Sequence, residues 1–157
     1  MKILVLGLGN ELLSDDGVGV LAARALREEL GGSADVVDTS LSGLALLDFF
    51  DGYDKAILID AVQTKRCPPG TVTELTPADL SAVVAPSPHY AGLPELLDLA
   101  GRLEMDFPDE IRIFAVEVVD PHTIGGAVSD PVRRSVGEVA ERVRSQVRLW
   151  REERVHA

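Results

Sequence analysis

The sequence predicts an α/β domain built on a mainly parallel sheet with helices on both faces. Residues 2–8 are a continuous apolar run, and residues 55–62 and 110–118 are two further mainly apolar segments that each suit a strand. Uninterrupted runs of this kind are typical of strands that are covered on both faces, as they are in a parallel sheet. Segments with helical spacing lie between the runs. Strands that alternate with helices along one chain favour this fold class.

The first half of the chain alternates strand and helix. Residues 2–8 end in glycine and are expected to form a buried strand. Ser14, Asp15 and Asp16 are favoured N-cap residues, so a helix is expected to start there. Gly31-Gly32 is expected to end that helix as a C-cap. The next expected elements are a strand at 34–38, a short helix or turn at 42–50, and a buried strand at 55–62.

The second half contains the clearest helix. Its apolar residues recur at steps of three or four and form one stripe that is expected to pack on the core: Val132, Val136, Val139, Val143, Val147 and Trp150. The expected elements before it are a loop at 65–70, an edge strand at 71–75, a helical turn at 77–80, an irregular segment at 84–90, a helix at 91–104, a strand at 110–118 and a loop at 120–129.

Length and composition narrow the possible functions. A chain of 157 residues fits one domain, and 46% apolar with 26% charged residues is ordinary for a globular protein. The single Cys67 excludes an internal disulfide framework and a multi-cysteine metal cage. A net charge of −11 disfavours nucleic acid and anionic membranes as partners. The first apolar run is too short for a signal sequence or a membrane span, so we expect a cytoplasmic protein.

Acidic residues and one histidine follow the predicted strands. The second strand ends in Asp38, the third ends in Asp60, and a later loop carries His89. Asp16 follows the first strand, after the turn that begins at Gly9. Ligands of open α/β sheets bind beyond the carboxyl ends of the strands, so these residues are expected on one rim. Carboxylates buried there lose solvation unless a partner compensates, and a cation is the simplest partner.

A metal site formed by Asp16, Asp60 and His89 is one interpretation of this rim. Two carboxylates and one imidazole suit a borderline divalent ion such as Ni²⁺ or Zn²⁺. Three protein ligands leave coordination positions open for a reacting group. The ordinary alternative is a helix cap, a loop acid and a surface histidine, and the spacing of the residues does not exclude it.

A dinucleotide-binding site and a nucleophilic catalytic site are two other interpretations of these residues. Dinucleotide binding requires a third glycine where this chain has Leu12, and Asp15 with Asp16 would repel a pyrophosphate. Asp38 stands at a plausible spacing for a ribose contact and keeps that interpretation open. A nucleophilic site has little support, because Cys67 has no histidine near it in sequence, Ser87 only precedes His89 by two residues, and no G-x-S-x-G elbow occurs.

Several segments, in order along nearly the whole chain, resemble the hydrogenase maturation endopeptidases, which process the large subunit of nickel–iron hydrogenases. The most specific are the opening GLGNELLSDDGVGV and the histidine segment SPHYAGLPELLDLA. The other matching segments are ILIDAV at 57–62, PPGTV at 68–72 and FAVEVVDPHTIGGAVSDPV at 114–132.

The resemblance implies more than the residues alone. It implies a twisted, mainly parallel five-stranded sheet in one three-layer domain over residues 1–157. It implies that Asp16, Asp60 and His89 are the metal ligands, and that the enzyme removes a C-terminal extension from the hydrogenase large-subunit precursor after nickel insertion. The nickel is expected to belong to the precursor, with zinc or another divalent ion as a possible substitute. Asp16 and Asp38 are the expected catalytic residues, and the enzyme is expected to be a monomer.

One departure affects Asp38. Many family members follow the corresponding aspartate with two glycines, whereas this chain has Thr39 and Ser40. Asp38 therefore stays open as a general base, a substrate-binding acid or a cap. Two other functions also stay open: a chaperone that senses nickel without cutting, and a nucleotide-binding oxidoreductase.

Overall fold

The computed structural model describes residues 1–82, 89 and 93–156. They form one three-layer α/β domain with a five-stranded sheet in the order β2-β1-β3-β5-β4. β1, β2, β3 and β5 are parallel, and β4 alone is antiparallel, at one edge. The expected fold class and the expected edge strand are confirmed. The strands are β1 (Ile3–Leu8), β2 (Asp35–Thr39), β3 (Lys55–Val62), β4 (Val72–Leu75) and β5 (Glu110–Glu117).

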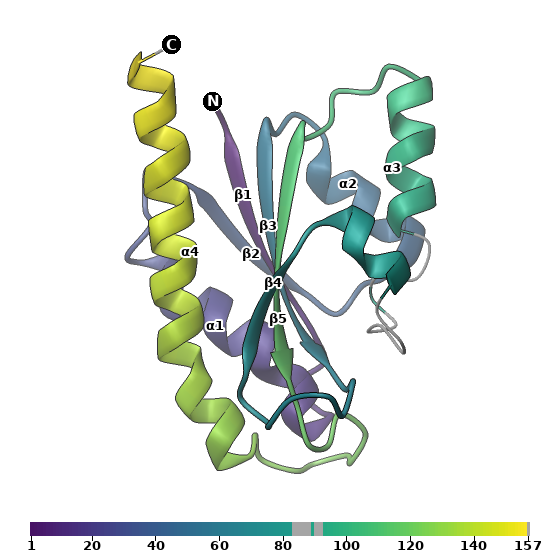
Figure 1. The fold of residues 1–157 in the computed structure, drawn as a ribbon, viewed down its shortest axis with the longest axis vertical. Helices are drawn as coiled ribbons and strands as arrows, with labels where there is room; N and C mark the ends of the chain where they lie inside the picture. Colours follow the sequence, from purple (N-terminus) through teal and green to yellow (C-terminus); the bar gives the residue numbers. More distant parts are fainter. Residues whose placement is uncertain (83–88, 90–92, 157) are drawn as a thin grey trace.

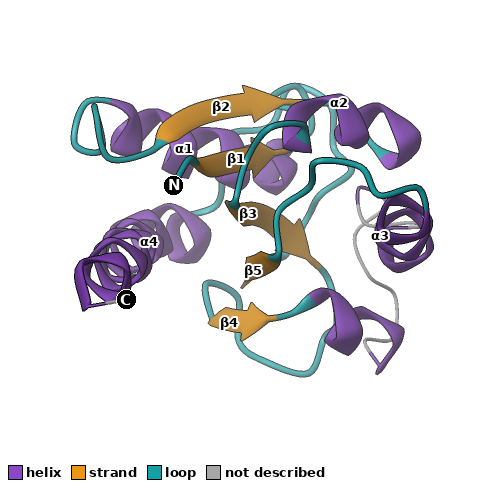
Figure 2. Ribbon diagram, turned by 90° about the horizontal axis from the view of Figure 1, so that it is seen from above, coloured by secondary structure: helices purple, strands orange, loops and turns teal. Residues whose placement is uncertain are grey.

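Helices cover both faces of the sheet (Figures 1 and 2). One face is covered by α1 and α4, and the other by α2 and α3. The α-helices are α1 (Val18–Arg27), α2 (Leu47–Phe50), α3 (Leu93–Arg102) and α4 (Asp130–His156), and the 3₁₀ turns are η1 (Ser14–Gly17), η2 (Gly43–Leu46) and η3 (Pro77–Ala82). The predicted irregular segment at 84–90, apart from His89, and the first residues of the predicted helix at 91–104 lie outside the described residues.

Alternate residues of β1 enter two separate cores. Ile3 and Val5 pack in the core under α1 and α4, whereas Leu4 and Leu6 pack in the core under α2 and α3. Successive side chains of a strand point to opposite faces, so a strand covered on both sides must be apolar throughout. This explains why KILVLGL is a continuous apolar run.

The stripe of α4 is buried as predicted. Val132, Val139, Val143, Val147 and Trp150 belong to the core on that face, and Val136 packs against it partly buried. No helix among the described residues is both long enough and apolar enough to span a bilayer.

The expected start of the first helix is wrong. Ser14, Asp15 and Asp16 lie in η1, and α1 begins at Val18 with no side-chain cap. The side chains of Ser14 and Asp15 bind backbone groups of the distant 119–129 loop instead. α1 also ends at Arg27, before Gly31, and the chain continues through tight turns to Ala34. Because the side chains of Ser14 and Asp15 form hydrogen bonds with that loop, they do not cap α1.

Candidate functional site

Three residues predicted as metal ligands meet at the carboxyl end of the sheet. Asp16 comes from η1, Asp60 from the end of β3, and His89 from the segment before α3. One ligand-type atom of each lies within 4.8 Å of the others, and all three residues are buried. In the strand order, β1 lies between β2 and β3, which makes the β1–β3 crevice the switch point where ligands of such sheets bind.

Neighbouring groups fix the orientation of these three side chains. Asp60 Oδ1 accepts a hydrogen bond from the Ala61 amide at 2.8 Å, and Asp60 Oδ2 lies 3.1 Å from His89 Nδ1. Asp16 Oδ2 accepts a hydrogen bond from the Asn10 amide at 2.8 Å. Each carboxylate therefore has one oxygen held by backbone, which limits its rotation.

The electrostatics of His89 reflect the two carboxylates beside it. Burial of the ring lowers its pKa, but the hydrogen bond and charge of Asp60 and the charge of Asp16 raise it, and the net result is a pKa above the ordinary value of 6.5. The site therefore attracts positive charge strongly enough to overcome the cost of burying it.

The donor set fits a divalent cation. Asp60 is fully buried and Asp16 is 7% exposed, so two carboxylates that repel each other stand together with little water. A cation between them relieves that repulsion, and two carboxylate oxygens with one imidazole nitrogen suit a borderline ion such as Ni²⁺ or Zn²⁺. Among the described residues, this group has the composition and closeness that a metal requires.

Asp38 is not part of this cluster. It lies on β2, where Oδ2 is 3.3 Å from an Arg24 guanidinium nitrogen and Oδ1 binds Arg27. Arg24 in turn makes a two-pronged ion pair with Glu11. Both oxygens of Asp38 are thus engaged by arginines, an arrangement that orients the carboxylate but competes with any bond to water.

A cavity of about 400 Å³ lies between the turn after β1 and the end of β2. Thr39 and Ser40 are among its lining residues, and so is Asp38. Asn10 also lines it, and the Asn10 amide binds Asp16. Asn10 therefore links the wall of the cavity to Asp16, although Asp16, Asp60 and His89 are not themselves among the lining residues. Its lining residues are Gly9, Asn10, Glu11, Leu12, Val20, Asp38, Thr39 and Ser40.

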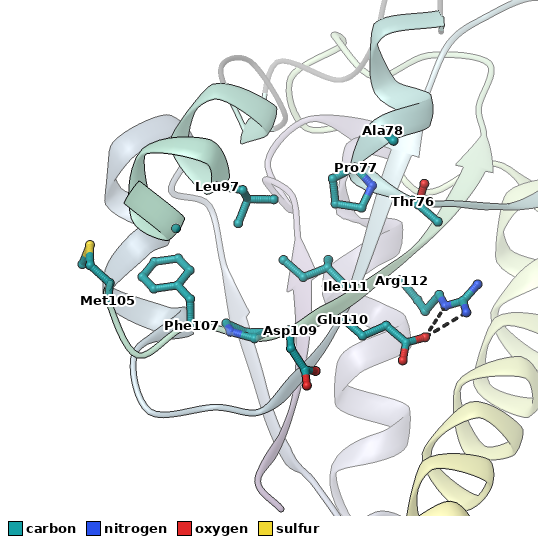
Figure 3. Close-up of a pocket in the computed structure, with 12 residues that line it drawn as sticks. Thr76, Pro77, Ala78, Leu97, Met105, Phe107, Asp109, Glu110, Ile111 and Arg112 are labelled. Atoms are coloured by element: carbon teal, nitrogen blue, oxygen red, sulfur yellow. Dashed lines mark hydrogen bonds and ion pairs between the residues drawn. The ribbon is translucent and has the colours of Figure 1, made fainter. Parts of the chain in front are cut away.

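A second hollow of about 510 Å³ lies at the opposite end of the sheet, where β5 begins (Figure 3). Leu97, Phe107 and Ile111 give it an apolar wall, and Glu110 pairs with Arg112 at its rim. Asp109, which also lines it, pairs with Lys55, so its charged groups all have ion-pair partners. The carboxyl end of the sheet remains the better candidate for chemistry.

Asp15 is the important residue that the sequence analysis misinterpreted. Its side chain is fully buried, and its Oδ2 accepts hydrogen bonds from the amides of Val119 and Asp120 at 3.0 and 3.1 Å. Ser129 donates to both oxygens, with its amide at 2.6 Å and its hydroxyl at 3.0 Å. Asp15 therefore fastens the 119–129 loop to the turn that carries Asp16. A pair of adjacent aspartates after a Gly-Asn turn was the available signal, but the partners are more than 100 residues away.

Two glycines allow the ligand-bearing turn to approach the sheet. A Cβ at Gly19 would collide with the carbonyl oxygens of Leu8 and Ile59, and a Cβ at Gly9 would collide with that of Asp16. Gly9 also has a φ of +149°, which side chains of L-residues rarely adopt. The third glycine of a dinucleotide-binding motif would stand at Leu12. In this chain Gly19 allows the close contact between helix and strand instead. The segment at 7–20 therefore supplies the glycines that allow close packing as well as the candidate ligand Asp16.

Of the two candidate nucleophiles, the structure describes only Cys67. Cys67 is exposed in the loop after β3. Ser87 lies outside the described residues.

Comparisons with known proteins indicate the family of this chain. A family model described as hydrogenase maturation protease matches residues 20–146. The hydrogenase 2 maturation protease of Escherichia coli is 34% identical over 128 residues, which cover 78% of this chain and 77% of that protein. The hydrogenase expression/formation protein HupD of Rhizobium leguminosarum bv. viciae is 29% identical, over 95% of this chain and 75% of that protein.

Solved structures of the same kind share the fold. The hydrogenase maturating endopeptidase HybD from E. coli superposes with a TM-score of 0.79 at 29% identity, covering 94% of this chain and 93% of that one. The [NiFe] hydrogenase maturation protease HybD from Thermococcus kodakarensis gives a TM-score of 0.72 at 28% identity, covering 94% and 99%. With the family model spanning most of the chain and the overall fold in agreement, this chain belongs to the hydrogenase maturation protease family.

Proposed function

We propose that this protease removes the C-terminal extension of a nickel–iron hydrogenase large-subunit precursor once nickel has been inserted. The observation that carries the proposal is the buried group of Asp16, Asp60 and His89 within 4.8 Å, in a chain of the hydrogenase maturation protease family. An acidic site of this kind is made to receive a cation, and the precursor would bring one with it.

Asp16, Asp60 and His89 are proposed to hold the nickel that the precursor already carries, with zinc or another divalent ion able to take the same place. A divalent ion bound there would polarise the scissile carbonyl or lower the pKa of a bound water. The contact between Asp60 and His89 orients the imidazole, and the Asn10 amide holds Asp16 in position. These contacts favour a preformed site that positions the peptide bond.

Asp16 and Asp38 are the proposed catalytic residues. Asp38 lines the cavity beside Asn10, whose amide binds Asp16, so it can face a substrate residue or the attacking water there. Its ion pairs with Arg24 and Arg27 hold its carboxylate in one orientation. Acting as a base requires Asp38 to release one arginine, whereas binding substrate does not. We further propose a cytoplasmic, monomeric enzyme formed by a single domain over residues 1–157.

The test is intact-mass spectrometry of a large-subunit precursor from the same genome after incubation with this protein. Nickel-loaded and nickel-free precursors are compared side by side. We expect loss of a C-terminal peptide from the nickel-loaded form alone. If the precursor binds and keeps its mass with nickel bound, the protein is a sensor and the proposed cleavage is wrong.

Two histidine variants separate the ligand role from a general effect. His89→Ala should abolish processing, while His122→Ala, at an exposed histidine of the 119–129 loop, should process at the wild-type rate. Wild-type activity in His89→Ala would refute the ligand assignment. Asp38→Asn should lower the rate at saturating precursor if Asp38 orients water, and should raise only KM if it binds substrate.

A further inference from the structure

We propose that Leu12 and Ile124 form an apolar docking surface for the precursor segment that reaches the ligand cluster. The inference rests on the proposed function and specifies how the substrate is recognised. Nothing in the chemistry of a nickel-binding site alone explains selection of one protein chain. A surface beside the site must supply that selection.

Leu12 and Ile124 are unusually open to solvent for large apolar side chains. Leu12 is 68% exposed and Ile124 is 80% exposed, and Val119 in the same loop is 50% exposed. Single exposed apolar residues are common on protein surfaces and need no function. These residues differ because they lie on two segments that the structure joins to each other and to the site.

Backbone contacts join the two segments. Leu13 and Ile124 form an isolated antiparallel bridge, and the Gly125 amide donates to the Leu12 carbonyl at 2.8 Å. The Ser14 hydroxyl donates to the Ala127 carbonyl at 3.1 Å. Leu12 and Ile124 therefore lie on two adjoining segments whose backbones are hydrogen-bonded to each other. A preformed surface of this kind loses little conformational freedom when a partner binds.

The segment that carries Leu12 is linked to the ligand cluster through Asn10. Asn10 binds Asp16 through its amide, and the Asn10 side chain accepts a hydrogen bond from the Leu12 amide at 3.0 Å. Leu12 also lines the 400 Å³ cavity beside Asp38. A chain that approaches Asp16 from the side of this cavity would lie against Leu12. Figure 1 shows the 119–129 loop at this same lower end of the sheet.

The negative charge of this surface favours a partner segment that is apolar and has no acidic residues. Residues 9–17 and 119–130 contain five acidic residues and no lysine or arginine. An acidic peptide would be repelled there, whereas a neutral or cationic apolar segment next to a metal ion would be attracted. Of the partners that this family's substrate offers, the segment flanking the metal centre of the precursor is the one that must approach this face.

The test measures processing of nickel-loaded precursor by Leu12→Ser, Ile124→Ser and the double variant. The matched control is Leu103→Ser, at a 63% exposed leucine just after α3. Both single variants should lower kcat/KM about tenfold, mainly through KM, because each removes one buried aliphatic side chain from the interface. The control should match the wild type. Zn²⁺ titration of the isolated double variant should give the wild-type affinity.

The outcomes separate this inference from the proposed function. If the wild type does not process any precursor, the proposed function fails. If the wild type processes the precursor and the double variant has the same KM, the docking surface is wrong. Light scattering adds a third outcome: a wild-type dimer that Ile124→Ser converts to a monomer, with precursor KM unchanged, would assign this surface to self-association and overturn the proposal.

Discussion

Replacing Asp15 should destabilise the fold more than any other single change at the carboxyl end of the sheet. Asp15→Ala would leave three backbone amides and one hydroxyl, all now bonded to its carboxylate, without that acceptor. An unsatisfied buried donor costs about 1–3 kcal/mol. The lost desolvation cost of the carboxylate and water entry offset part of the sum, so we expect a loss of about 3–5 kcal/mol.

The asparagine variant provides a graded comparison. In Asp15→Asn, the amide oxygen can take the place of Oδ2 and keep the donors of Val119, Asp120 and the Ser129 hydroxyl. The amide nitrogen would then face the Ser129 amide, donor against donor. One lost bond of this kind should cost about 1–3 kcal/mol. Asn should therefore lie between the wild type and Ala.

Urea unfolding measures these changes, and amide hydrogen exchange locates them. The amides of Val119, Asp120 and Ser129 should lose protection first in Asp15→Ala. The control is Asp98→Ala, which removes only an exposed pair with Arg102 and should change stability by less than about 0.5 kcal/mol. Equal unfolding midpoints for the Asp15 and Asp98 variants would refute the reasoning that Asp15 holds the loop.

Three further predictions concern packing and pH. Gly19→Ala should cost about 1–3 kcal/mol, because its Cβ would collide with two backbone carbonyls, and an unchanged thermal midpoint would contradict this close approach. Trp150→Ala should cost about 3–5 kcal/mol in urea, since the side chain is fully buried and its indole N–H binds Glu110; a loss below 1 kcal/mol would show that α4 does not depend on it. Burial raises the pKa of Glu110, but its bonds to Arg112 and Lys55 and their charges lower it more, so the net pKa lies below its ordinary 4.5. The stability it contributes is complete above 4.5 and is lost as pH falls through the lowered pKa, so Glu110→Gln should flatten the stability curve at pH values below 4.5; an unchanged slope would refute the pairing.

The sheet could be predicted because its strands carry their own signal. A strand covered on both faces is apolar along its length, as β1 is and as β3 is apart from Lys55 and Asp60, and the stripe on α4 repeats at the helical period. These patterns depend on near neighbours in sequence. The five-strand count came from the resemblance, and the order of the strands was not predicted, because no local pattern records which strands pair.

The site was predictable only in part for the same reason. Residue types and strand ends suggested Asp16, Asp60 and His89, but only the fold brings these distant residues within 4.8 Å. Asp15 was misinterpreted as a cap because its true partners, at 119–129, are invisible to local rules. The arginines that bind Asp38 lie on α1, and nothing in the spacing from 24 to 38 indicates the ion pairs.

The contact of Gly19 with Leu8 and Ile59 has a consequence for redesign. At that point main chain rests on main chain, with no side chain between them that could be enlarged or trimmed. The separation between the turn of Asp16 and the end of β3 is therefore set by backbone alone. An engineer can exchange the side chains at the ligand positions and so alter which ion is preferred. The spacing of the anchor points themselves stays constant unless the helix is moved as a whole.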